Sequence, residues 1–151
     1  KAAKANDKRH CYVYTVEVPA FTNDNHIFSC KRVNKEIVSR AEKAVDETIP
    51  EEVTTTGKYF RKYLGNILTG QRSTTKKMMS KAYASAENAV SEFLNKIGVV
   101  YLAWPQSQTK PDGDTNRAVL NENDIRIVKI EQVEVDEKNR LIEGSEIPIK
   151  L

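Results

Sequence analysis

The chain contains few of the residues that build metal sites and catalytic centres. Its 151 residues include two histidines, two cysteines and six glycines. Neither His10 nor His26 has a carboxylate pair near it at helical spacing, and Cys11 and Cys30 form no CxxC motif. A zinc site needs several such ligands together, and a nucleophilic side chain needs an adjacent base. We therefore expect no metal, no cofactor and no catalytic residues, and we predict that the protein is not an enzyme.

Glycine-rich phosphate loops and long apolar runs are also missing. The glycines belong to no GxGxxG, GxSxG or Walker A sequence. No apolar run approaches the roughly 18 residues that a membrane helix needs, so we expect no membrane partner. The N-terminal sequence KAAKANDKRH lacks the hydrophobic region of a signal peptide. We expect an intracellular protein, either cytoplasmic or within a nucleoprotein or virion-type assembly, that is not secreted through a signal peptide.

With two cysteines, the chain has no disulfide framework of the kind that holds small secreted domains together. Free cysteine is among the most buried residue types, so we expect Cys11 and Cys30 to be reduced, half-buried thiols. The alternative is a disulfide between the two segments that carry them, and the sequence leaves that choice open.

Acidic residues are absent from one central stretch of the chain. Between Thr54 and Tyr83 there are seven Lys or Arg residues and no Asp or Glu. Residues 53–110 carry nine basic and two acidic side chains, residues 111–151 carry six basic and ten acidic ones, and the whole chain has a net charge of +3. Such a distribution indicates that the two regions neutralise each other, within the fold or between copies, or that the basic region faces a polyanion.

Two segments near the N-terminus have the composition of β-strands. Cys11–Val18 and His26–Val33 are rich in β-branched and aromatic residues, and a turn-rich stretch separates them, so we predict a β-hairpin. Residues 1–10 are polar and basic and are expected to form a flexible tail. Because strand side chains alternate between two faces, four residues are expected to form the core face: Tyr12, Tyr14, Val16 and Val18.

Three central segments show the apolar spacing of amphipathic helices. Residues 34–48 form the first predicted helix, with the leading asparagine as its N-cap. A threonine among residues 54–56 caps the second helix, and Gly70 ends it. The third helix begins at the serine or threonine of residues 73–74 and ends at Gly98.

The remaining C-terminal segments are predicted to be strands. Val99–Trp104 is an unbroken apolar run that favours burial on both faces, residues 106–117 are expected to form a long loop, and residues 118–135 form one or two strands. Residues 147–151 contain Pro148, which favours an edge strand. Because strands and helices are segregated along the chain, we predict an α+β fold. We expect a single compact domain over residues 11–151, with an N-terminal β-hairpin, three central helices and C-terminal antiparallel strands.

The basic side chains of the second and third predicted helices are the candidate site. Two helices joined by a short turn that contains glycine resemble, in outline, the helix pair of DNA-binding proteins. Several cations on one face favour salt-dependent contacts with phosphates, and Tyr59 is available to stack on a base. The predicted nucleic-acid-binding residues are Lys58, Arg61, Lys62, Arg72, Lys76, Lys77 and Lys81.

The first hypothesis is therefore a non-enzymatic module that binds the phosphate backbone of DNA or RNA through a basic helical face. An alternative is that these cations pair with the acidic C-terminal third or are simply solvated. The second hypothesis is a structural subunit of a larger particle, for example a virion-type component. Such a subunit would bind other protein subunits or its own copies through oppositely charged surfaces and an edge strand. An enzyme without a recognisable motif ranks third.

Overall fold

The computed structural model describes residues 9–70, 79–107 and 109–151, and the side chains of 79–85 and 111–112 are not described. Contacts divide the chain into two compact units. The terminal unit is formed by the chain ends, up to Val18 and from Ile125 onward, and the central unit is Pro19–Asp124. Three helices and two three-stranded sheets form a mixed α+β fold, as predicted. The single domain over residues 11–151 stays a prediction.

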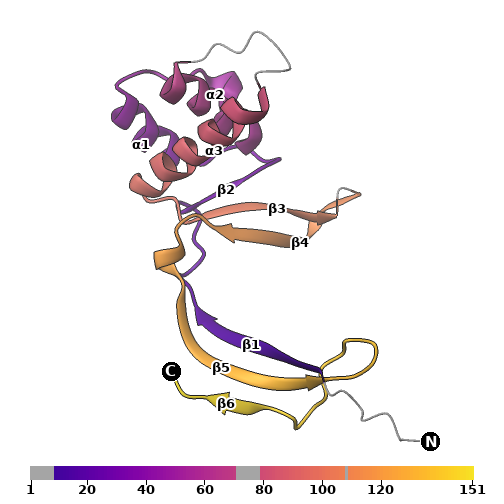
Figure 1. Ribbon diagram of the computed structural model, residues 1–151. Coiled ribbons are helices and arrows are strands. Elements are labelled where there is room, and N and C mark those ends of the chain that lie inside the picture. Colours follow the sequence, from indigo (N-terminus) through magenta and orange to yellow (C-terminus); the bar gives the residue numbers. More distant parts are fainter. Residues whose placement is uncertain (1–8, 71–78, 108) are drawn as a thin grey trace, which may run out of the picture. The chain divides into compact units, whose positions relative to one another are not determined.

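The central unit contains all three helices and one sheet (Figure 1). Its sheet has the order β2-β3-β4, and no helix in the described ranges is long and apolar enough to cross a bilayer. The elements are β2 (His26–Phe28), α1 (Lys35–Val45), α2 (Gly57–Thr69), α3 (Met79–Lys96), β3 (Tyr101–Ser107) and β4 (Lys110–Val119), with 3-10 turns at Glu51–Thr54 and Glu122–Asp124.

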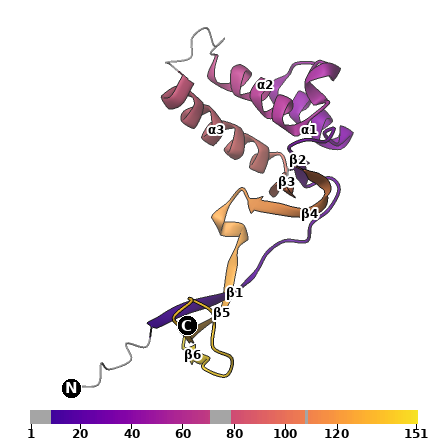
Figure 2. The same cartoon turned by 90° about the vertical axis from the view of Figure 1, so that its right-hand side faces the viewer.

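One hydrophobic core holds the helices together and against β2. Figure 2 shows α2 and α3 side by side, and their apolar residues meet in this core. Fully buried side chains at helical spacing, such as Phe60 and Leu64 on α2, contribute buried apolar surface that stabilises the unit. The core residues are Ile27, Val33, Ile37, Ala41, Ile49, Phe60, Leu64, Val90, Leu94 and Val99.

The strand β3 is buried on both faces over its first residues, as its unbroken apolar composition predicts. Leu102 packs against the helical core, while Tyr101 and Ala103 are 4% and 1% exposed. The hydroxyl of Tyr101 donates to the carbonyl of Pro19, and the ring of Phe21 lies 5.3 Å from the ring of Tyr101. The residues that lead into β2 therefore cover the second face of this strand.

The predicted N-terminal hairpin is wrong. The strand β1 (Arg9–Glu17) pairs antiparallel with β5 (Arg126–Val135), and β2 pairs in parallel with β3. The segment from His26 is a strand for only three residues, after which it turns toward α1. A parallel pair needs a long crossover connection, which the three helices provide here, so the strand partner of β2 lies far away in the sequence.

The predicted long loop over residues 106–117 is also wrong. Most of it belongs to an antiparallel hairpin of β3 and β4, in which Trp104 pairs with Asn116 and Ser107 pairs with Lys110. Strand propensity depends strongly on context. Polar residues of low propensity form a strand here because β3 lies alongside and supplies the backbone hydrogen bonds.

The terminal unit is a three-stranded antiparallel sheet with the order β1-β5-β6. The C-terminal strand β6 (Ile147–Ile149) lies at an edge of this sheet, as the position of Pro148 predicts. Its central strand β5 turns at Asp136, which accepts hydrogen bonds from the backbone N–H groups of Arg140 and Lys138 at 2.9 and 2.8 Å. The hydrogen bond from the Arg140 backbone is the main cause that lowers the pKa of Asp136.

The predicted core face of β1 is wrong as well. Tyr12 and Tyr14 are 55% and 54% exposed, and Val16 and Val18 are 44% and 46% exposed. The opposite face is better covered, because Cys11 pairs with Val133, which is 3% exposed. Both faces of β1 have apolar residues, so alternation alone did not identify the one that its sheet buries.

Helix α1 begins at its predicted cap and ends earlier than expected. The side chain of Asn34 accepts a hydrogen bond from the backbone N–H of Glu36 at 2.8 Å and donates to the carbonyl of Asn23 at 2.9 Å. The helix ends at Val45, because Asp46 adopts a left-handed conformation (φ 55°). The helix therefore ends three residues before the predicted end at residue 48.

Loss of this cap is expected to destabilise the central unit. Asn34→Ala removes both hydrogen bonds and should lower the free energy of unfolding by about 1–2 kcal/mol. Chemical denaturation followed by the fluorescence of Trp104, the single tryptophan, measures this unit. Asn34→Asp should recover only part of the loss, since aspartate also caps helices but its carboxylate cannot donate to the carbonyl of Asn23. An unchanged midpoint in Asn34→Ala would contradict the assigned cap.

Candidate functional site

Helix α2 is held rigidly by its first turn. The hydroxyl of Thr56 accepts a hydrogen bond from the backbone N–H of Tyr59 at 3.2 Å. A Cβ on Gly57 would lie 2.4 Å from the carbonyl oxygen of Phe28, so only glycine fits this close approach. The other end of the helix is closed by Gly70 in a left-handed conformation (φ 64°), as predicted. The surface that α2 presents is therefore fixed in place.

The outer face of α2 carries Lys58, Tyr59 and Lys62. All three side chains are exposed, and Tyr59 is 56% exposed. Residues four apart on a helix are neighbours, so the two ammonium groups lie on one side, with the aromatic ring next to them in sequence. Within the described part of the chain, no acidic side chain forms an ion pair with either lysine.

Arg61 differs from these two lysines. Its guanidinium donates a hydrogen bond to the carboxylate of Glu87 on α3, and the two side chains are 22% and 33% exposed. The Nε atom of Arg61 is buried and has no hydrogen-bond partner among the described residues. Arg61 therefore joins α2 to α3, and the outer face of α2 presents two predicted cations rather than three.

The other four predicted residues cannot be placed on this face. Arg72, Lys76 and Lys77 lie outside the described residues, as does the predicted start of the third helix. Lys81 belongs to α3, and only its backbone is described.

A second basic segment, which is not among the predicted site residues, lies against the first turn of α2. The backbone N–H groups of Gly57 and Lys58 donate to the carbonyls of Lys31 and Ser29 at 3.0 and 2.9 Å. Lys31 and Arg32 are exposed. These contacts bring the sequence Cys30-Lys31-Arg32 next to the basic helix. Nothing in the local pattern indicates this, because it depends on how closely Gly57 approaches Phe28.

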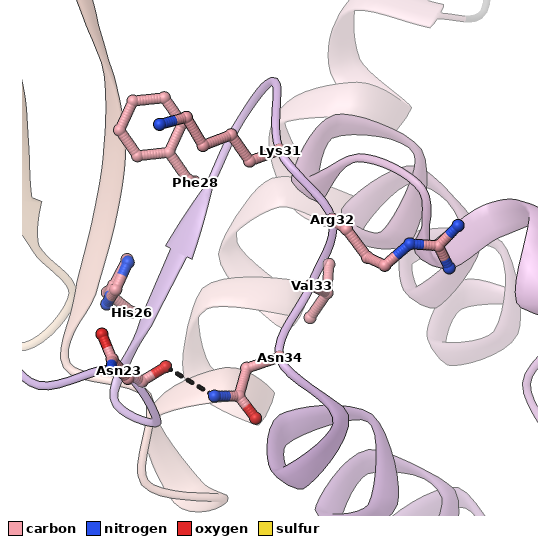
Figure 3. A pocket seen from close by; sticks show the side chains of 7 residues that line it. All are labelled: Asn23, His26, Phe28, Lys31, Arg32, Val33 and Asn34. Atoms are coloured by element: carbon pink, nitrogen blue, oxygen red, sulfur yellow. Dashed lines mark hydrogen bonds between the residues drawn. The ribbon is translucent and has the colours of Figure 1, made fainter. Parts of the chain in front are cut away.

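A pocket of about 360 Å³ lies beside this segment, and Figure 3 shows the side chains that line it. Most of its polar groups already serve the fold. Asn34 caps α1, Arg32 forms an ion pair with Glu51 at 3.2 Å, and Lys31 lies over the ring of Phe28, 5.0 Å from its centroid. The Nδ1 atom of His26 bonds to the carbonyl of Thr22 at 2.6 Å. The pocket is therefore a weaker candidate site than the outer face of α2.

Potential metal ligands are not clustered in the described part of the chain. No set of three or more His, Cys, Asp or Glu side chains lies close enough to hold a metal ion in the ranges that the structure describes. Cys11 and Cys30 are free, and Cys30 is exposed rather than half-buried. Comparison with protein-family models, curated proteins and solved structures found no match to this chain.

Proposed function

We propose that the protein is a non-enzymatic module that binds the phosphate backbone of nucleic acid through the outer face of α2. The observation that carries this proposal is the pair of exposed lysines, Lys58 and Lys62, for which the described residues offer no acidic partner. A solvent-exposed helix face without a binding role usually carries charges of both signs, since oppositely charged residues four apart stabilise the helix. Helix α2 contains no acidic residue.

The position of these lysines adds a second argument. A cation near the N-terminus of a helix opposes the helix dipole, which favours negative charge there. Lys58 is the second residue of α2, and the first turn has no acidic residue to compensate. The backbone N–H groups of Gly57, Lys58 and Tyr59 are already hydrogen-bonded within the fold, so a phosphate group would bind here through the ammonium group of Lys58 and the favourable helix dipole. Lys58 therefore has a small unfavourable electrostatic interaction with the helix dipole, which a bound polyanion would offset.

Tyr59 and the neighbouring basic segment would extend the surface. An exposed aromatic ring beside cations is the arrangement on which unpaired bases stack, so this part of the proposal favours single-stranded nucleic acid. Arg72, Lys76, Lys77 and Lys81 remain proposed contacts. In this proposal Arg61 is a positioning residue, because its bond to Glu87 fixes α2 against α3.

The test is a titration of labelled single-stranded and double-stranded DNA and RNA, followed by fluorescence anisotropy at about 50 mM salt, where phosphate contacts are strong. Lys58→Glu/Lys62→Glu should weaken binding by roughly tenfold or more, because two attractive phosphate contacts become repulsive. The four probes separate DNA from RNA and single strands from duplexes. Tyr59→Ala should weaken binding of single strands more than of duplexes.

A matched control separates the site from net charge. Lys35→Glu/Lys43→Glu makes the same change of charge on exposed positions of α1, and it should change the affinity much less. Equal losses in the two double variants would mean that only net charge matters. Absence of binding by the unmodified chain to all four probes would remove the proposal.

A further inference from the structure

The longest free strand edge in the terminal unit belongs to β1. This strand has nine residues, contains no proline, and pairs on one side with β5. The described residues place no strand on its other side. An open edge of this length presents a row of unpaired N–H and C=O groups, and proteins normally protect such edges with proline, inward-pointing charge or a covering element.

The hydrogen bonds around β5 show which groups of β1 face this edge. The carbonyl of Glu134 accepts from the N–H of Ile142 at 3.0 Å, and its own N–H donates to the hydroxyl of Ser145 at 2.9 Å. Glu134 therefore bonds away from β1, although it stands opposite His10. Antiparallel pairs alternate between bonded and non-bonded, so Tyr12 and Tyr14 direct their backbone groups to the free edge.

The side chains along this edge are also uncovered. Tyr12, Tyr14 and Val16 share one face of the sheet and are 55%, 54% and 44% exposed. The strands β5 and β6 continue the same face, because Tyr14 pairs with Ile130 and Ile130 pairs with Ile149. Between His10 and Glu17 of β1, this face of the three strands carries no charged residue. It is mainly apolar, and Gln132, opposite Tyr12, is a polar residue within it.

We propose that the free edge of β1 pairs antiparallel with β1 of a second copy of this chain. The register that overlaps all nine residues places the two-fold axis at Val13. It sets Tyr12 opposite Tyr14 of the second copy, and both of these residues direct their backbone groups to the edge, as a bonded pair requires. The two sheets then form one six-stranded sheet, in which the mainly apolar faces of the two copies are joined.

Charge complementarity selects a second copy as the partner. The same register sets Arg9 opposite Glu17 of the second copy at both ends of the strand pair, so opposite charges meet twice. In the single chain these two residues have weak, exposed partners. Arg9 bonds to Asn139 at 3.3 Å, and Glu17 lies 3.6 Å from Arg126. An exposed ion pair of this kind is exchanged at little cost.

The other edge of the sheet is a poorer template. The strand β6 has three residues, and Pro148 at its centre stands opposite Glu131. By the same alternation, the backbone groups of Glu131 point toward β1, so Glu131 and Pro148 form a non-bonded pair. The backbone nitrogen of Pro148 therefore points to the outer edge, and it has no hydrogen to donate to a further strand. The proposed interface is therefore at β1 and is independent of the proposed function of α2.

Sedimentation equilibrium over a range of concentrations tests the interface. The 151-residue chain should form a dimer, and Arg9→Glu or Glu17→Arg should raise the dissociation constant roughly tenfold, because attraction becomes repulsion at both ends. The double variant Arg9→Glu/Glu17→Arg restores opposite charges and should recover the dimer. Recovery of this kind would not follow if either residue acted only within one chain.

Disulfide trapping tests the register. Cys11 stands opposite Thr15 of the second copy in a non-bonded pair, where the Cα atoms are about 4.5 Å apart, a distance that a disulfide spans. Thr15→Cys with Cys30→Ser should give a covalent dimer after oxidation by glutathione disulfide. The same variant with Cys11→Ser leaves thiols only at position 15, which this register keeps apart, and it should stay uncrosslinked.

Three results would overturn the proposal. One is a monomer at every concentration, and another is a dimer that is insensitive to the charge reversals and equally crosslinked without Cys11. The third is slow hydrogen exchange at the amides of Tyr12 and Tyr14 that does not depend on protein concentration, since this would show that the chain covers the edge itself.

Discussion

Gly57→Ala should lower the free energy of unfolding of the central unit by roughly 3 kcal/mol or more. The added methyl group would lie 2.4 Å from the carbonyl oxygen of Phe28 and 2.5 Å from Cγ2 of Ile27. The first atom is backbone, and Ile27 is 1% exposed, so neither can move without disturbing the core. The same shift would stretch the hydrogen bond from the N–H of Gly57 to Lys31.

Gly65→Ala is the matched control on the same helix. Its added Cβ would lie 3.6 Å from Val90 and 3.7 Å from Ala86, which are ordinary contact distances. Alanine in a helix interior is about 0.5–1 kcal/mol better than glycine, so this variant should be slightly stabilised. Urea unfolding followed by the fluorescence of Trp104 measures both variants. Equal stability of the two would contradict the close approach of α2 to β2.

Leu64→Ala should destabilise the central unit by roughly 2–5 kcal/mol. Leu64 is 0% exposed and belongs to the core that joins the helices to β2. Its removal leaves a cavity that a rigid, close-packed interior fills only in part. Since natural domains are stable by about 5–15 kcal/mol, a loss of this size should shift the unfolding midpoint strongly.

The control for this variant lies one turn further along α2. Leu68→Ala removes the same atoms from a side chain that is 36% exposed, so the loss should be well below that of Leu64→Ala. Thermal and urea unfolding of both variants make the comparison. Similar losses at the two positions would contradict the exposure of Leu68 and would show that the last turn of α2 is as well covered as its centre.

Local signals predicted the helices well. Apolar residues at helical spacing gave α1 and α2 their buried faces, and Asn34, Thr56 and Gly70 stand where capping chemistry requires them. These features can be predicted from the sequence because the backbone hydrogen bonds of a helix join residues only four apart. The mixed α+β class followed from the order of the segments.

Strand partners could not be predicted in the same way. A strand forms its backbone hydrogen bonds with another segment of the chain. The alternation of apolar and polar residues in β1 does not indicate whether that segment is β2 or β5. The parallel pairing of β2 with β3 depends on three intervening helices. The exposed face of β1 was mistaken for the core because alternation identifies two faces without ranking them.

The candidate site was predictable where it rests on one helix. The spacing of Lys58 and Lys62 relative to Phe60 and Leu64 was enough to place the lysines outward. Arg61 was assigned to the same surface, but its side chain pairs with Glu87. That contact depends on how α2 packs against α3, which the sequence of α2 alone does not reveal.

The most direct test of the proposed function is the salt dependence of binding. The slope of the logarithm of the association constant against the logarithm of salt concentration counts the phosphates that the protein neutralises. In Lys58→Gln/Lys62→Gln, the slope should be smaller by about 1.8 for duplex DNA or about 1.4 for a single strand. In Lys35→Gln/Lys43→Gln, the slope should be unchanged. A slope that is the same in Lys58→Gln/Lys62→Gln as in the unmodified chain would contradict the proposed function, because these lysines would then touch no phosphate.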